Sequence, residues 1–302
     1  MASSGASPTA SRHVLALFGP TASGKTAVAG LLREQLSAEV ISADSAALYD
    51  GIPILTAAPA YPAHLVGVVP LSSDVSVGRY QRLAHAAIDA ADTPLVVGGT
   101  GLYFRAALSE LAIPPRGRRE HWQDEVDRLG PEAAHALLAE RDPAAAARVH
   151  ANDRRRVVRA LELAETGHSL APSDDRLWTA DTRHPTTIVA LELPLAELDR
   201  RIAERTSTMA TAGAAEEAAR AWAQPLSETA RKVLGLEEFA TLPLDEAVER
   251  VTVATGRLAR YQRKWLRRMP GVVTLDANRP PEEIAADIVA LGRTGQHLSR
   301  HD

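Results

Sequence analysis

One eight-residue run combines two glycines, a lysine and a threonine at the spacing of a phosphate-binding loop. Residues 19–26 read GPTASGKT, which matches G-x-x-x-x-G-K-[ST]. The run lies between a β-branched apolar stretch, 14–18, and a stretch with apolar residues at helical spacing, 27–36, so it joins a predicted strand to a predicted helix. In such a loop, backbone N–H groups and the helix N-terminus face an anion, while Lys25 neutralises phosphate oxygens. The alternative is a chance glycine-rich turn.

The chemistry of this loop defines a first set of site residues. It recognises a diphosphate rather than a nucleotide as such, and the Thr26 hydroxyl can bind Mg²⁺, which we expect as the cofactor. The predicted diphosphate-binding residues are Gly19, Thr21, Ala22, Ser23, Gly24, Lys25 and Thr26, with Thr26 as the metal ligand.

An acidic residue follows the next predicted strand, 39–42. Asp44 is therefore expected at the carboxyl edge of the sheet, where open α/β folds bind their ligands. A carboxylate there can act as a general base or as an outer ligand of magnesium. The alternative is that Asp44 caps a helix beginning at Ser45.

The strand predicted at 95–97 ends in Gly98-Gly99-Thr100. An ordinary phosphate-loop ATPase would carry an acidic residue there to help hold magnesium, so ATP hydrolysis is disfavoured. A Gly-Gly-Thr turn instead suits a close backbone approach and one hydroxyl hydrogen bond to an anion. Thr100 is also a possible N-cap of the helix predicted at 101–107.

Strands and helices alternate along most of the chain. Strands are predicted at 14–18, 39–42, 64–69, 95–97, 187–193 and 272–275, and helices at 27–36, 77–91, 101–107, 195–222, 245–269 and from 281 onward. Between them, 120–129, 132–141 and 153–166 are helical with no strand among them. We therefore predict an α/β fold: a parallel phosphate-loop sheet flanked by helices, comprising 12–112 and 184–302, with a helical insertion domain at 113–183 and a disordered tail at 1–11.

The composition excludes several classes of protein. The 302 residues are 45% hydrophobic and 24% charged, which is enough apolar material for a sizeable core. There is no cysteine, so disulfides, thiolate metal sites and cysteine nucleophiles are excluded, and a cytoplasmic location is expected. No apolar run approaches the ~20 residues of a membrane helix, so no membrane is expected as a partner.

The net charge of −4 conceals basic clusters. Residues 257–268 hold six cations and no acid, and helical spacing places Arg257, Arg260, Lys264 and Arg267 on one face, with Leu258, Tyr261 and Trp265 expected to face the core. Further clusters are Arg154, Arg155, Arg156 and Arg159, and Arg116, Arg118 and Arg119. Such faces are either ordinary solvated surface or a path for a nucleic acid.

Motifs along the whole chain resemble those of the tRNA dimethylallyltransferase family. They include GPTASGKT at 19–26, ISADSAALY at 41–49 and VGGTGLYFRAAL at 97–108, and the resemblance runs from 14 to about 276. Later matches include His150-Ala151-Asn152-Asp153, Arg156, Arg159-Ala160-Leu161-Glu162 and Gly167; Arg205, Met209 and Gly213; and Ala254-Thr255, Leu258-Ala259, Gln262 and Trp265-Leu266-Arg267.

The resemblance implies transfer of a dimethylallyl group from dimethylallyl diphosphate to the exocyclic N6 amine of the adenosine 3′ of a tRNA anticodon. Asp44 would accept the amine proton, while Lys25, Thr100 and Arg205 would stabilise the leaving diphosphate. tRNA contacts are implied for Asp44, Ser45, Ala46, Ala47, Arg156, Arg159, Arg260 and Lys264. We expect a monomer, and the target base to be extruded from its stack.

The chain departs from the family mainly at expected tRNA contacts. Ala58 stands where the family usually has lysine, Leu236 where it has tyrosine, and Gly256 and Tyr261 where it has arginines. Two alternatives therefore remain: transfer of the same group to a free adenosine phosphate (AMP, ADP or ATP), and, from another class, a phosphate-loop kinase of a small metabolite with Asp44 as base.

Overall fold

The computed structural model describes residues 13–114, 117–171 and 176–293, so the predicted tail at 1–11 lies outside the described residues. The chain divides into two compact units. One runs to Glu110 and resumes at Trp178, and the other is Leu111–Leu177. The helical insertion was predicted to end at 183, whereas residues 178–183 belong to the first unit. The polar contacts described below account for this difference.

Five parallel strands form the sheet of the first unit. They are β1 (Val14–Phe18), β2 (Glu39–Ser42), β3 (Pro94–Gly98), β4 (Thr186–Glu192) and β5 (Val272–Asp276), in the order β2-β3-β1-β4-β5. Ala16 of the central strand pairs with Val96 on one side and Ile188 on the other, and all three are buried. Apolar runs of this kind are typical of strands covered on both faces. The predicted α/β class is confirmed.

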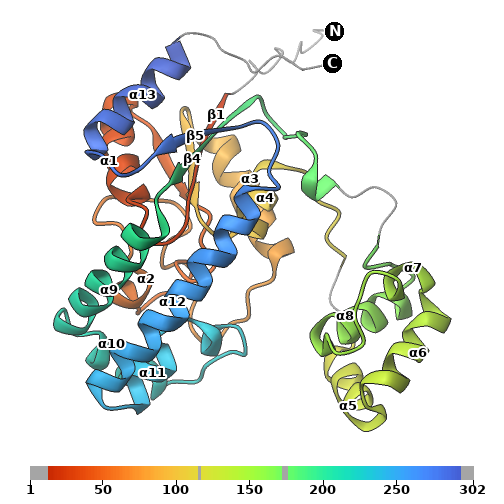
Figure 1. The fold of residues 1–302 in the computed structure, drawn as a ribbon. Helices are drawn as coiled ribbons and strands as arrows, with labels where there is room; N and C mark the ends of the chain where they lie inside the picture. The colour runs from red at the N-terminus through yellow and green to blue at the C-terminus, as the bar shows by residue number, and fades with distance from the viewer. Residues whose placement is uncertain (1–12, 115–116, 172–175, 294–302) are drawn as a thin grey trace, which may run out of the picture. The chain divides into compact units, whose positions relative to one another are not determined.

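Helices cover both faces of this sheet. They are α1 (Lys25–Leu36), α2 (Pro53–Thr56), α3 (Val77–Ala90), α4 (Gly101–Leu108), α9 (Leu195–Thr211), α10 (Ala214–Trp222), α11 (Leu236–Thr241), α12 (Leu244–Leu266) and α13 (Pro281–Arg293). Helices α1 and α13 lie side by side against one face, and α3 and α4 pack as a pair on the other (Figure 1). Leu17, Val28, Leu32 and Ile284 are fully or almost fully buried in one apolar core.

Two elements differ from their prediction. The strand predicted at 64–69 is absent, and only isolated bridges form, at His64 and at Val69. Leu65 and Gly67 each have a φ of 63°, which prevents an extended chain between the bridges. The helix predicted at 195–222 is split into α9 and α10 by Gly213, whose φ is 98°.

The second unit consists of helices joined by short loops, with no strand among its described residues. It contains α5 (Arg119–Leu129), α6 (Pro131–Arg141), α7 (Pro143–Ala146) and α8 (Arg154–Glu165), and the short 3₁₀ helix Arg176–Trp178 begins at its end. Trp122, Leu138 and Leu161 are buried in a core of its own. The unit therefore has an apolar core distinct from that of the sheet.

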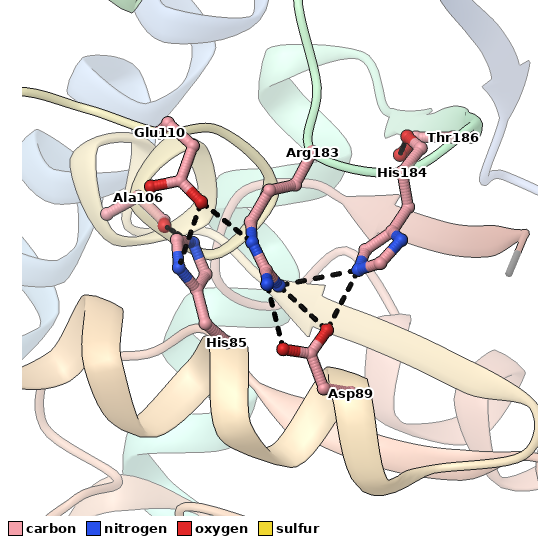
Figure 2. Close-up of polar contacts among 7 residues, drawn as sticks. All are labelled: His85, Asp89, Ala106, Glu110, Arg183, His184 and Thr186. Carbon is pink, nitrogen blue, oxygen red and sulfur yellow. Dashed lines mark hydrogen bonds and ion pairs between the residues drawn. The ribbon is translucent and has the colours of Figure 1, made fainter. Parts of the chain in front are cut away.

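A polar cluster ties the two chain segments that flank the insertion to α3 (Figure 2). Arg183 donates two hydrogen bonds of 2.8 Å to Asp89 and forms a 2.7 Å ion pair with Glu110. His184 Nε2 lies 2.9 Å from the Asp89 carboxylate. These bonds hold the pKa of Asp89 down at about 2, chiefly through Arg183. Together with the hydrogen bonds that Arg105 donates to the Thr179 and Asp181 carbonyls, the cluster holds residues 178–183 to the sheet unit.

Replacing Arg183 by glutamine should loosen this cluster without opening the core. Because the ion pairs are partly exposed, we expect a loss of about 1 kcal/mol, which lowers the melting temperature by ~2–4 °C. Hydrogen exchange at 178–186 should also accelerate. Arg82→Gln, at an exposed position on the same helix as Asp89, is the control. Unchanged exchange at 178–186 in Arg183→Gln would mean that the cluster does not hold this segment.

Candidate active site

The loop between β1 and α1 is curled by two residues in the left-handed region. Ala22 has a φ of 62° and Gly24 a φ of 89°, which turns the backbone before α1 begins at Lys25. A Cβ at Gly19 would lie 2.7 Å from Ser23 Oγ and 3.2 Å from the Leu191 carbonyl, so only glycine fits there. The Lys25 ammonium donates a 2.6 Å hydrogen bond to the Pro20 carbonyl, which holds it across the loop. The loop thus has the cradle shape that the motif predicts.

Glycines bring the loops after β1, β2 and β3 into backbone contact. A Cβ at Gly98 would lie 2.4 Å from the Ala43 carbonyl, and one at Gly99 would lie 2.6 Å from the Gly19 carbonyl. Gly19 also donates its N–H to Gly98 at 3.2 Å. The Gly-Gly turn therefore serves close packing of three strand ends, beside the phosphate loop.

Asp44 lies at the carboxyl end of β2, as predicted. Its Oδ1 accepts the Ala46 N–H at 2.9 Å, and residues 45–48 form turns rather than a helix. The alternative role, capping a helix that begins at Ser45, is therefore excluded. The turn fixes the carboxylate with one oxygen bound to its own backbone.

Asp44 and the phosphate loop line one small pocket of about 90 Å³. Its polar side chains are those of Thr21, Lys25, Thr26, Ser42, Asp44, Thr56, Tyr61, Arg205 and Gln262, and its apolar wall includes Val40, Ala57, Ala58, Pro59, Val66 and Val97. Thr100 is not among the lining residues. It is the N-cap residue of α4, the position that the alternative interpretation predicted, although its side chain makes no capping hydrogen bond. The pocket can accept a molecule with an anionic end and a small apolar tail.

Arg205 reaches this pocket from α9. It is half buried, and its guanidinium interacts electrostatically with both Asp44 and Lys25. Burial lowers the pKa of Lys25 to about 7, with Asp44 opposing the shift and Arg205 adding to it. Burial also lowers the pKa of Arg205. Two desolvated cations that face one carboxylate make a site suited to a dianion.

Sequence reasoning gave no role to two side chains that hold the loop. Gln262 of α12 is 3% exposed and accepts the Thr21 N–H at 2.7 Å. The Tyr61 hydroxyl donates to the Thr26 carbonyl at 3.0 Å, and burial raises the pKa of Tyr61 to about 12. A signal for Gln262 did exist, since it recurs at helical spacing with Thr255, Ala259 and Leu266, which are all buried.

This buried stripe corrects the predicted orientation of α12. Leu258 and Tyr261, expected to face the core, are 39% and 56% exposed. The prediction took large apolar side chains as the core face, whereas the helix packs through smaller residues and an amide.

The predicted nucleic-acid contacts fall on both units. In the first, Lys264 is exposed, whereas Arg260 forms a 2.7 Å ion pair with Asp199. Ser45 and Ala46 are half buried beside Asp44, and Ala47 lines the pocket. In the second unit, Arg156 is exposed, while Arg159 pairs with the buried Glu162 at 2.9 Å. Of the third basic cluster, Arg116 lies outside the described residues and Arg118 pairs with Glu165.

The donor set suits a magnesium ion that takes few ligands from the protein. Among the described residues, no group of three or more His, Cys, Asp or Glu side chains could hold a metal. Thr26 and Asp44 nevertheless place a hydroxyl and a carboxylate in the pocket. Mg²⁺ typically binds through one or two such oxygens, together with substrate phosphates and waters.

The fold and pocket place a phosphate-loop motif beside a carboxylate, an arrangement suited to a diphosphate. Residues 47–269 match the family model described as IPP transferase. A tRNA dimethylallyltransferase of Anaeromyxobacter dehalogenans (strain 2CP-C) is 41% identical over 294 residues, covering 90% of this chain and 98% of that protein. One from Kineococcus radiotolerans is 40% identical over 306 residues, covering 92% and 96%.

A solved structure has the same fold. It is the full-length tRNA isopentenylpyrophosphate transferase of Bacillus halodurans, which is 27% identical with a TM-score of 0.68 and covers 96% of this chain and 100% of that chain. The chain belongs to the tRNA dimethylallyltransferase family of prenyltransferases. In the part of the chain that the structure describes, no helix has the length and apolarity to cross a bilayer.

The lowered pKa of Lys25 predicts proton uptake when a diphosphate binds. At pH 8 the amine is mostly neutral, and a nearby dianion raises its pKa, so binding takes up a proton. The uptake should fade toward pH 6, where the amine is already charged. Titration calorimetry of pyrophosphate in buffers of different ionisation enthalpy measures it. Lys25→Arg, which keeps the charge but does not titrate, should lose the Lys25 contribution; identical uptake in both proteins would contradict the assignment.

Proposed function

We propose that this chain transfers a dimethylallyl group from dimethylallyl diphosphate to the N6 amine of the adenosine 3′ of the anticodon in tRNA. One observation carries the proposal. A single pocket combines a phosphate loop, two desolvated cations and an apolar wall with a carboxylate fixed by its own turn. Those are the requirements for holding a prenyl diphosphate and removing a proton from an attacking amine.

In the proposed reaction each group has a defined part. The loop N–H groups, Lys25 and Arg205 bind the diphosphate, and the apolar wall takes the five-carbon tail. The N6 lone pair forms a bond to C1 of the prenyl group as the C1–O bond breaks, and the electron pair leaves with pyrophosphate. Asp44 accepts the amine proton. Because the cations face the leaving group, they stabilise its growing charge.

Two further assignments belong to this proposal. Mg²⁺, held through Thr26 and the substrate phosphates, would add charge neutralisation at the leaving group. Thr100, which begins α4 directly after Gly98 and Gly99, would add one hydroxyl hydrogen bond to the diphosphate if the donor extends past the lining residues. The chain would act as a monomer on an extruded base.

The proposed acceptor is tRNA, and a free adenosine phosphate is the competing one. The competitor draws support from the acceptor side of the molecule, where Arg260 is neutralised by Asp199 and Ala58 adds no charge to the pocket. The support for tRNA is the family membership and the cations of α12. A phosphate-loop kinase has less support, because the end of β3 carries Gly98 in place of an acid.

One experiment separates these acceptors. Purified protein is incubated with radiolabelled dimethylallyl diphosphate and magnesium, together with unmodified tRNA or with AMP, and the label in each acceptor is counted. We expect label in tRNA, at the adenosine 3′ of the anticodon. Label in AMP alone would show that the acceptor is a free adenosine phosphate and not tRNA. Label in neither would rule out prenyl transfer, and phosphorylation by ATP would be tested next.

Asp44→Asn should slow the transfer by about 10²- to 10⁴-fold, the usual worth of a positioned general base. The amide cannot take the proton, yet it can keep the hydrogen bond to the Ala46 N–H and so preserve the turn. Affinity for dimethylallyl diphosphate, measured by calorimetry, should change little. The control is Asp50→Asn, an exposed acid of the same loop. A transfer rate equal to wild type would remove Asp44 from the mechanism.

A further inference from the structure

An exposed tyrosine stands on α12 where the chain departs from its family. Tyr261 is 56% exposed, the largest exposed fraction among the large hydrophobic side chains of the described residues. Its ring meets Trp265, one helical turn on, edge to face at 6.5 Å between centroids. An exposed aromatic side chain is not unusual by itself, so its surroundings decide what it can do.

The ring against which Tyr261 packs is firmly held. A Cβ at Gly101 would lie 2.1 Å from the Trp265 ring, so the indole rests directly on the backbone at the start of α4. Trp265 also packs against Trp178, with 4.7 Å between the ring centroids. The Arg268 guanidinium carbon lies 3.6 Å from the centroid of the Trp178 ring. Tyr261 is therefore the exposed edge of a packed aromatic group rather than an isolated side chain.

The charge around Tyr261 is positive. Arg257 lies four residues before it, Lys264 three residues after, and Arg268 a turn beyond Lys264, and all three are exposed. No acidic residue occurs between 257 and 268. An aromatic face bordered by cations is the recognition surface for unpaired nucleotides, whose bases stack while their phosphates meet the cations.

The position of this surface relates it to the pocket. Gln262, the next residue, lines the pocket and holds the phosphate loop through Thr21. Trp265 rests on Gly101, three residues after Gly98, another lining residue. Tyr261 therefore lies on the same helical turn as a lining residue of the pocket.

We propose that Tyr261, supported by Trp265, stacks an unpaired base next to the reacting adenosine in the anticodon loop. The proposal rests on the proposed function and adds one acceptor contact to it. Stacking does not read the base edge, so the contact should raise affinity for the loop with little preference for which base occupies it. It offers an alternative to a charged contact at a position where the family usually has arginine.

Steady-state kinetics with tRNA test the contact. Tyr261→Ala should raise the KM for tRNA about 5- to 100-fold, the range for loss of one stacked base, with the KM for dimethylallyl diphosphate unchanged. Tyr261→Phe should retain wild-type values, because the ring rather than the hydroxyl carries the contact. Leu258→Ala, at a second exposed apolar position of α12, is the matched control. A Tyr261→Ala protein with the wild-type KM for tRNA, or a Phe variant as weak as the Ala variant, would overturn the proposal.

A binding measurement separates failure of this contact from failure of the proposed function. Anticodon stem-loops carrying 2-aminopurine at either neighbour of the target adenosine should be quenched on binding to wild type and to Tyr261→Phe at one of the two positions. The quenching should be lost in Tyr261→Ala. If wild type transfers label to tRNA but quenches neither probe, the stacking proposal fails alone. If wild type binds and quenches but transfers no label, the proposed reaction fails and the base contact stands.

Discussion

The close backbone approach of three strand ends is the constraint on which the site depends. Three glycines make this approach possible: a Cβ at Gly19, Gly98 or Gly99 would meet another backbone at 2.4 to 3.2 Å. Because the loops after β1, β2 and β3 can touch, Lys25 at the start of α1 and Asp44 after β2 line the same small pocket. A methyl group at Gly98 would push the Ala43 carbonyl, and Asp44 follows it directly. The distance between the diphosphate cradle and the proposed base is thus set by packing.

Electrostatics follow from the same packing. An ammonium, a guanidinium and a carboxylate line a cavity of only about 90 Å³. A cavity of this size does not admit enough water to hydrate all three groups fully. Desolvation lowers the pKa of Lys25 to about 7 despite the opposing field of Asp44. A dianion bound beside two desolvated cations would offset part of their desolvation cost, whereas a neutral ligand of the same size would offset none of it. The pocket is therefore suited to a diphosphate.

The elements of the fold were largely readable from the sequence, and the reasons are local. Strands at 14–18 and 39–42 are short β-branched runs at the observed bounds, and the phosphate loop is fixed by motif and context. The prediction of a strand at 64–69 was wrong because the positive φ at Leu65 cannot be read from the composition of the segment. The role of Arg205 was predicted from the family resemblance alone, and Gln262 was noted only as a motif residue, because their place in the pocket depends on tertiary packing of α9 and α12 onto the loop. The orientation of α12 failed for the same reason: its core face is built from Thr255, Ala259 and Gln262, whereas the larger Tyr261 faces solvent.

Helix α12 connects the two halves of the proposed reaction. The buried Gln262 amide oxygen of this helix accepts the Thr21 N–H of the phosphate loop. The neighbouring residue, Tyr261, exposes its ring to solvent. One turn of the same helix therefore carries both a contact to the phosphate loop and the proposed acceptor contact. The Asp199 to Arg260 ion pair joins the same helix to α9, which carries Arg205, so the two helices that complete the pocket are also linked at their exposed faces.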